Sequence, residues 1–141
     1  MNIPQNRNQN NLKPKITALA ITLNEEDNVK RYIQSLSFAD EIIFIDSNST
    51  DATVAIAKEL GVKVIQRNFD DFSKQRNFAV EQAKNDWIIF FDLDEIITPE
   101  LGKEIIAVTA SQNKITAFYV KSNFHFMGKE IKYGGWKSKK S

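Results

Sequence analysis

The sequence predicts an α/β domain with a mainly parallel sheet and helices on both of its faces. Runs of apolar, β-rich residues recur at intervals of roughly 20 residues, which is typical of repeated strand–helix units. Between these runs, apolar residues are spaced three or four positions apart, as on the buried side of a helix. The run at 87–91 contains no polar residue and therefore suits a strand that is buried on both faces.

The first strand–helix unit is expected within residues 16–36. Residues 16–23 are apolar and β-rich and predict a central strand. Asn24 follows at once and is expected to be the N-cap of the next helix, because its side chain can accept a hydrogen bond from a free backbone N–H group. Glu25 and Glu26 would then lie in the first turn, where the helix dipole favours acidic residues.

The second unit begins with a strand over residues 41–46, which ends in a carboxylate, Asp46. The polar turn at 47–51 precedes a helix over 52–60, and Gly61 is expected to stop that helix. A short third strand follows at 62–65. Acids that follow strands, such as Asp51 and Glu25, are also frequent N-caps, so that a purely structural role is open for both.

The remaining elements alternate in the same way. Residues 68–72 are expected to form a loop, and 74–83 a helix; the buried strand at 87–91 comes next. Another helix is predicted from Thr98, with Pro99 at its first position, and a fifth strand at 116–120. Residues 1–14 are rich in Asn and Gln and are expected to be a disordered leader.

Composition and charge narrow the class of protein. The 141 residues include no cysteine, which excludes disulfides and thiolate metal sites, and no apolar run approaches the ~20 residues of a membrane span. We therefore expect a cytoplasmic protein. The net charge of +1 combines basic ends with an acidic middle, which does not favour nucleic-acid binding. The basic ends could contact the inner face of the cytoplasmic membrane, although a solvated tail explains them as well.

The acidic pair Asp92 and Asp94 follows the most apolar strand. Ligands of open α/β sheets bind at the carboxyl ends of strands, above all where the first and fourth strands would be neighbours. Two acids so close repel each other unless a cation joins them, and a divalent cation is the natural candidate. We therefore expect this D-x-D turn to hold a metal ion that binds a diphosphate. Asp46 could accept a hydrogen bond from a nucleobase, and Arg76 or Lys74 could meet the phosphate charge.

Four motifs together resemble family 2 glycosyltransferases of the GT-A fold, a Rossmann-like α/β architecture. They are I-T-L-N-E-E (21–26), D-S-N-S-T-D (46–51), Q-R-N with a later Ala (75–79) and D-L-D-E (92–95), in the order and spacing of that family. Residues 124–136, which include Gly134, Gly135 and Trp136, resemble the lipopolysaccharide core β-glucosyltransferase branch. The resemblance covers about residues 15–136.

The resemblance implies an inverting transfer of a sugar from a nucleoside-diphosphate sugar, usually a UDP-sugar, with Mg²⁺ or Mn²⁺. The acceptor would be a glycan or a lipopolysaccharide-type glycolipid of the cell envelope. Residues 15–120 would form the nucleotide-sugar-binding domain, and 121–141 the start of the acceptor-side region. Asp94, with Asp92, would bind the metal ion. The donor nucleotide would contact Thr22, Asn24, Glu25, Asp46, Arg76 and Asp92.

The chain departs from the family pattern at two points. Leu23 stands where many members have Tyr, so that stacking of the nucleobase is expected to be weaker. Members also continue well past the Gly-Gly-Trp sequence, and their acceptor site and catalytic base lie in that later part. The chain therefore resembles a member truncated at its C-terminus. No residue in it can be assigned as the base, whose loss typically costs ~10²–10⁴ in rate.

Two alternatives to an active transferase follow from the residues. A non-catalytic remnant would bind a nucleotide sugar without turnover. A haloacid-dehalogenase-like phosphatase also carries F-D-x-D at the end of a strand, but it has Gly-Thr where this chain has Glu95 and Ile96. UDP binding without transfer would favour the remnant, whereas a failure to bind UDP would exclude both the remnant and the transferase.

Overall fold

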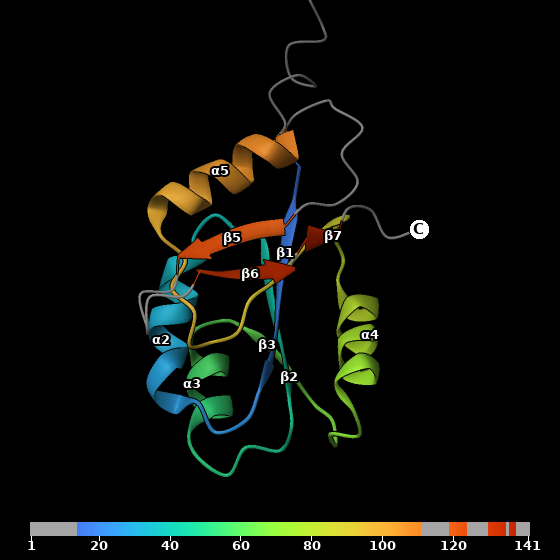
Figure 1. Cartoon of the computed structure of the whole chain (residues 1–141). Coiled ribbons are helices and arrows are strands. Elements are labelled where there is room, and N and C mark those ends of the chain that lie inside the picture. Colours follow the sequence, from blue (N-terminus) through green and yellow to red (C-terminus); the bar gives the residue numbers. More distant parts are fainter. Residues whose placement is uncertain (1–13, 111–118, 124–129, 135, 138–141) are drawn as a thin grey trace, which may run out of the picture.

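The computed structural model describes residues 14–110, 119–123, 130–134 and 136–137, and its centre is a five-stranded sheet (Figure 1). Four strands are parallel to one another, and one edge strand is antiparallel. In spatial order the strands are β3 (Lys63–Gln66), β2 (Glu41–Asp46), β1 (Ile16–Thr22), β4 (Trp87–Phe90) and β7 (Trp136–Lys137). This confirms the predicted α/β class with a mainly parallel sheet.

Helices cover both faces of the sheet, as predicted. Helices α2 (Glu26–Ser35), α3 (Thr53–Glu59) and α5 (Pro99–Ala110) lie on one face, and α4 (Phe72–Gln82) lies on the other (Figure 1). The strands divide their side chains between the two resulting cores. Ala18 and Ala20 of β1 pack with α2, whereas Leu19 packs on the side of α4. The apolar character of the strands thus reflects burial on both faces.

Strand β1 lies between β2 and β4, so that the chain crosses to the other side of β1 after β3. The register places Leu19 of β1 beside Ile43 of β2 and beside Phe90 of β4. The first and fourth strands are therefore neighbours, which is the condition on which the expected switch point depended. Their carboxyl ends meet at the topological switch point of the sheet, where ligands bind in open α/β proteins.

The helices begin and end close to the predicted residues. Thr98 Oγ1 accepts a hydrogen bond of 3.1 Å from the backbone N–H of Leu101, which confirms Thr98 as the cap of α5. Gly61 follows α3 with a φ of 86°, a conformation that favours glycine and ends the helix. Helix α4 begins at Phe72, earlier than predicted, because the Asp71 side chain caps it by accepting a 2.8 Å hydrogen bond from the Lys74 N–H.

Two further strands, β5 (Tyr119–Asn123) and β6 (Glu130–Gly134), form a separate antiparallel sheet. The predicted strand at 116–120 is therefore confirmed at its last two positions, and 116–118 lie outside the described residues. The predictions for residues 1–13 and for the basic tail at 138–141 also fall outside them. No helix in the described part of the chain has the length and apolar character that crossing a membrane requires.

Candidate functional site

A cleft with a volume of about 580 Å³ opens at the carboxyl ends of β1 and β4. Its apolar lining consists of Ile21, Leu23, Phe69, Phe72 and Phe90. Its polar lining consists of Thr22, Glu25, Ser47, Arg76, Asp92 and Asp94. The structure therefore brings together five of the residues predicted for the site. The other two, Asn24 and Asp46, are not among the residues that line the cleft.

The turn that carries Asp92 and Asp94 is anchored in the core. Leu93, between the two acids, is fully buried, while both aspartates are exposed. The Tyr32 hydroxyl donates a hydrogen bond of 2.9 Å to the backbone carbonyl of Phe91, directly before the turn. This packing holds the two carboxylates at the cleft on a rigid support, as a binding site requires.

Negative charge is concentrated around this turn. Burial, together with Asp94 and Asp92, raises the pKa of Glu25 to about 7. Burial and the same two acids raise the pKa of Glu95 to about 8. Although Asp92 as a whole is exposed, partial desolvation of its carboxyl group at the cleft and the charge of Asp94 raise its pKa, and the charge of Arg76 offsets part of that rise. The cluster therefore favours an additional positive charge.

The acidic cluster fits a divalent cation that is shared with a bound molecule. Asp92 and Asp94 offer carboxylate oxygens, which Mg²⁺ and Mn²⁺ prefer as ligands. Glu25 Oε2 is buried and has no hydrogen-bond partner in the described part of the chain, so it would gain from a nearby cation. Among the described residues, no three acidic, His or Cys side chains converge as a metal-binding group. A cation on the two aspartates would therefore need further oxygen ligands from diphosphate or water.

Arg76 supplies a positive charge to the same end of the cleft. It projects from α4, and its guanidinium carbon lies 4.3 Å from the centroid of the Phe90 ring, a cation–π contact. Phe90 is the last residue of β4, so this contact holds the guanidinium close to the turn at Asp92. An anionic group in the cleft would thus meet a fixed positive charge beside the two aspartates.

The structure gives Asp46 a different place from the one predicted. Its carboxylate is fully buried. Asp46 Oδ1 accepts hydrogen bonds from Thr22 Oγ1 at 2.7 Å and Ser49 Oγ at 2.6 Å, and Oδ2 accepts one from the Ser49 N–H at 2.8 Å. Because these bonds satisfy the carboxylate inside the protein, the geometry does not support a further bond to a nucleobase. The neutral side chain of Ser47, the next residue, lines the cleft instead.

Asn24 contributes to the fold rather than to the cleft lining. The prediction that it caps the first helix is wrong, because the N-cap position of α2 is Glu25, which makes no side-chain cap bond. Asn24 has a φ of 50°, and its Oδ1 accepts hydrogen bonds from the N–H groups of Thr50 at 2.7 Å and Asp51 at 3.3 Å. Asn tolerates this left-handed conformation better than most residues, and its short side chain fixes the loop after β2.

The loops after β1 and β2 also cap each other's helices. Asp51 Oδ2 accepts a hydrogen bond of 3.2 Å from the N–H of Glu26 in α2, and its Oδ1 accepts one of 2.9 Å from the N–H of Thr53 in α3. Glu26 Oε2 accepts a bond of 2.9 Å from the Ala52 N–H, and Thr53 Oγ1 one of 2.8 Å from the Glu25 N–H. In each helix, the first N–H group and that of the N-cap residue are thereby satisfied. The structural role left open for Asp51 is confirmed, whereas the Glu25 side chain lines the cleft.

Two phenylalanines that the sequence analysis placed in or at the end of a loop also line the cleft. Phe69 and Phe72 are 46% and 69% exposed, and their rings make an edge-to-face contact with centroids 4.9 Å apart. A loop has no periodic pattern that would mark a functional side chain, and so neither residue was singled out. The available signal was the presence of two aromatic residues in a loop that is otherwise polar and acidic.

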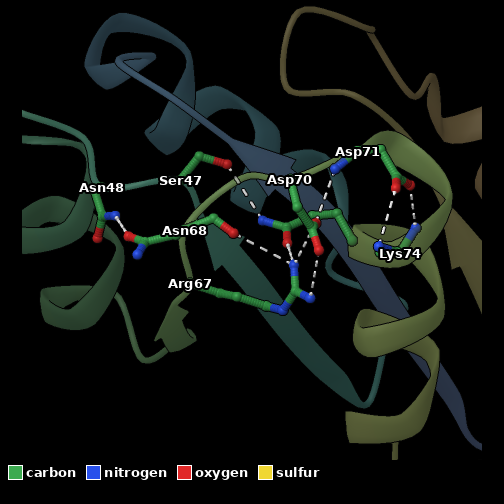
Figure 2. A network of polar contacts seen from close by, with 8 residues as sticks. Ser47, Asn48, Arg67, Asn68, Asp70, Asp71 and Lys74 are labelled. Atoms are coloured by element: carbon green, nitrogen blue, oxygen red, sulfur yellow. Dashed lines mark hydrogen bonds and ion pairs between the residues drawn. The ribbon is translucent and has the colours of Figure 1, made fainter.

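Arg67 holds the loop that carries these rings (Figure 2). Its Nη1 and Nη2 donate hydrogen bonds to the two carboxylate oxygens of Asp70 at 2.9 and 3.2 Å, and Nη1 also donates to Gln75 Oε1. The bond to Arg67 lowers the pKa of Asp70 to about 2. Gln75 is fully buried, and its Nε2 donates to Ser47 Oγ at 3.3 Å. One network thus joins the loop, α4 and the end of β2.

Comparison with known proteins identifies the family to which these motifs belong. A family model described as glycosyl transferase family 2 matches residues 17–133. The chain belongs to glycosyl transferase family 2. The matched residues contain all of β1 to β4 except Ile16, and every residue that lines the cleft. The phosphatase alternative is therefore wrong, even though the D-x-D turn ends a buried strand as that alternative required.

Individual relatives extend the comparison. A glycosyltransferase of Rickettsia bellii (strain RML369-C), described as uncharacterized, is 45% identical over 104 residues, which are 73% of this chain and 35% of the relative. The lipopolysaccharide core biosynthesis glycosyltransferase LpsC of Rhizobium meliloti (strain 1021) is 27% identical over 121 residues, which are 82% of this chain and 45% of LpsC. The chain thus spans less than half the length of these two relatives.

A solved glycosyl-transferring enzyme structure agrees with the fold. Glucosyl-3-phosphoglycerate synthase from Mycobacterium tuberculosis, in complex with Mn²⁺, UDP and glucosyl-3-phosphoglycerate, matches this chain with a TM-score of 0.52 and 26% identity. The match covers 57% of this chain and 34% of the synthase. The predicted Rossmann-like GT-A fold is confirmed by this similarity and by the strand order.

Proposed function

We propose that the cleft binds a nucleoside-diphosphate sugar, and that Asp92 and Asp94 bind its diphosphate through a divalent cation. The observation that carries the proposal is the acidic cluster at the switch point, where both aspartates line the cleft and Glu25 Oε2 is buried without a partner among the residues that the structure describes. A cation held by two aspartates favours a ligand that supplies further oxygens. The Mn²⁺ and UDP bound by the M. tuberculosis synthase support the same ligand class.

Different lining residues would contact different parts of the donor. Asp92 and Asp94 would hold the cation, and Arg76, fixed on Phe90, would meet remaining negative charge of the diphosphate. Thr22 and Glu25 would line the middle of the donor site at the end of β1. Asp46 and Asn24 would affect donor binding only indirectly, because their hydrogen bonds to Ser49 and Thr50 hold the loop after β2 in place.

In the proposed reaction, an acceptor hydroxyl attacks the anomeric carbon and the nucleoside diphosphate leaves with inversion at that carbon. The bound cation would act as a Lewis acid that stabilises the charge of the leaving group. Buried Leu93 and the Tyr32 hydroxyl keep the D-x-D turn in one position, so that Asp92 and Asp94 are oriented before the donor binds. The base that takes the proton of the acceptor is not assigned to any described residue.

We further propose that the donor is a UDP-sugar and that the acceptor is a glycan or a lipopolysaccharide-type glycolipid. UDP in the M. tuberculosis synthase supports the first part, and the similarity to LpsC supports the second. A glycolipid acceptor would place the protein at the cytoplasmic face of a membrane. The lysines near the end of the sequence would favour contact with an anionic membrane surface.

Calorimetric titration with UDP tests the donor site. The wild-type chain should bind UDP more tightly with Mn²⁺ than with a chelator, and Asp94→Ala should abolish this metal dependence. Asp27→Ala is a matched control, because Asp27 is exposed on α2 and does not line the cleft. A wild-type chain that binds no UDP, with or without Mn²⁺, would overturn the proposal.

An activity assay separates an active transferase from a non-catalytic remnant. Release of UDP from UDP-sugars should be followed with and without glycan acceptors, since turnover would establish that the chain carries a working transferase. Metal-dependent UDP binding without any turnover would favour the remnant, in which only the donor site is kept.

A further inference from the structure

We propose that the nucleobase of the donor stacks on the Phe69–Phe72 pair, and that the protein discriminates only weakly between nucleobases. This inference rests on the proposed function, because it assigns the part of the donor that lies away from the diphosphate. The inference gives a role to two exposed rings that lie outside the family motifs. Its second part, weak discrimination between nucleobases, follows from the burial of the Asp46 carboxylate.

Strand order places the pair at the nucleoside end of the cleft. The sheet runs β3-β2-β1-β4, and the D-x-D turn follows β4 on one side of β1. On the other side, Ser47 follows β2 directly, and Phe69 comes shortly after the end of β3. A donor whose diphosphate lies at the D-x-D turn therefore extends its nucleoside toward Ser47, Phe69 and Phe72.

The rings offer a surface that suits a nucleobase. Every base presents a π-face, so stacking on aromatic side chains is tolerant of base identity. Phe72 is 69% exposed and Phe69 is 46% exposed, which leaves ring surface available beyond their contact with each other. Leu23 of the loop after β1, 52% exposed, adds an apolar contact to the same cleft.

Weak discrimination follows from the hydrogen-bonding groups at this end. The Asp46 carboxylate, which could select a base with an N–H edge, is buried and accepts three hydrogen bonds from Thr22 and Ser49. Ser47 lines the cleft instead, and its hydroxyl can serve as donor or acceptor for either kind of base edge. Sites that bond a specific edge reject the wrong ligand by about 10⁴-fold or more, whereas apolar sites discriminate by about 10- to 200-fold at most.

The loop that carries the rings is ordered by its own contacts. Asp70, between the two phenylalanines in sequence, is held by both terminal nitrogens of Arg67 (Figure 2). Asp71 caps α4 through the Lys74 N–H, which fixes Phe72 at the first position of that helix. A preformed aromatic surface lowers the entropy that the donor must lose on binding.

Titration of the full chain with UDP, CDP and inorganic diphosphate in the presence of Mn²⁺ tests the inference. UDP and CDP have bases of the same ring size but different hydrogen-bonding edges, and they should bind within about tenfold of each other. Phe69→Ala and Phe72→Ala should each weaken UDP binding about 5- to 150-fold, the range for loss of base–aromatic stacking. Neither variant should change the binding of inorganic diphosphate.

Two controls accompany these variants. Phe72→Tyr keeps an aromatic ring and should retain UDP binding. Leu60→Ala removes an exposed apolar side chain outside the cleft and should change nothing. Circular dichroism should show that every variant is folded, as expected for substitutions of exposed residues.

Several outcomes would overturn the inference. The first is UDP binding more than about 200-fold tighter than CDP binding, which would require a specific hydrogen bond to the base edge. The second is unchanged UDP binding by the folded alanine variants, which would show that the nucleobase does not stack on the rings and that they are available to an acceptor instead. Equal loss of UDP and inorganic diphosphate binding is the third. If the wild-type chain bound neither UDP nor inorganic diphosphate, the proposed function itself would fail.

Discussion

Thr22 Oγ1 donates a 2.7 Å hydrogen bond to Asp46 Oδ1 between the ends of β1 and β2. Both residues are buried, and the register pairs them directly across the two strands. A charged group in such a place is stable only when its oxygens are hydrogen-bonded, and Ser49 supplies the other bonds. The pair therefore stabilises the floor of the cleft, although its two members were predicted to contact the donor.

Thr22→Val should destabilise the protein by about 1–3 kcal/mol, because it leaves the buried charge of Asp46 with one bond fewer while it preserves the shape of the side chain. Urea denaturation gives the free energy of unfolding. Thr22→Ser is the matched control, since it keeps the hydroxyl group. Equal stability of the valine and serine variants would show that the hydrogen bond contributes nothing.

Asn24→Ala should destabilise the protein more than Asn24→Gly does. Both variants lose the hydrogen bonds to Thr50 and Asp51. Alanine is also strained at a φ of 50°, by about 1–2 kcal/mol, whereas the flexibility of glycine costs about 0.5–1 kcal/mol. The free energies of unfolding should follow this order, and Asn77→Ala, at an exposed position of α4, should have little effect. A less stable glycine variant would contradict the role of the left-handed backbone.

The sheet and its switch point could be predicted because their signals are local and repeated. Each strand is an apolar run of a few residues, and two helices carry a recognisable start or stop residue, Thr98 at the start of α5 and Gly61 after α3. Placing the D-x-D turn at a cleft required one further step, the rule that strand ends collect at one edge of a parallel sheet. Five predicted site residues line the cleft for this reason.

The places of Asp46 and Asn24 could not be predicted, because they depend on pairings that the local sequence does not reveal. Asp46 is bonded to a residue 24 positions away, and Asn24 to one 26 positions away. A carboxylate at a strand end is equally compatible with a ligand and with a buried hydroxyl partner. Phe69 and Phe72 were missed for a related reason, since only the fold brings their loop to the cleft.

Without a divalent cation, stability should fall as the pH rises from about 5 to about 8. The pKa values of Glu25 and Glu95 in the folded protein, about 7 and about 8, lie above the ordinary value of 4.5. Between the ordinary pKa and these raised pKa values, the folded state binds more protons than the unfolded state. A rise in pH through this range therefore favours unfolding. Melting temperatures measured in a chelator across this range should decrease, and Mn²⁺ should restore stability at the high end.

Glu25→Gln should flatten this pH profile, because the glutamine remains neutral in the acidic cluster. Glu59→Gln, at an exposed position of α3, is the control and should keep the wild-type profile. Parallel profiles for the wild type and Glu25→Gln would show that the Glu25 carboxyl group does not control the pH response.

Arg67→Lys should weaken UDP binding without altering any residue that lines the cleft. Lysine cannot reproduce the two-nitrogen contact to Asp70 together with the bond to Gln75. The loop that carries Phe69 and Phe72 would then be less ordered, and UDP would have to order it on binding, at a cost of about 2- to 12-fold in affinity.

Inorganic diphosphate does not reach that loop in the proposed binding mode, so its affinity should not change in Arg67→Lys. Arg31→Lys is the matched control, because Arg31 lies on α2, outside the cleft lining, and donates a 3.1 Å side-chain hydrogen bond to Asn28. An equal loss of UDP and inorganic diphosphate affinity in Arg67→Lys would contradict the mechanism. It would indicate that Arg67 acts on the phosphates through its charge rather than on the aromatic loop through Asp70.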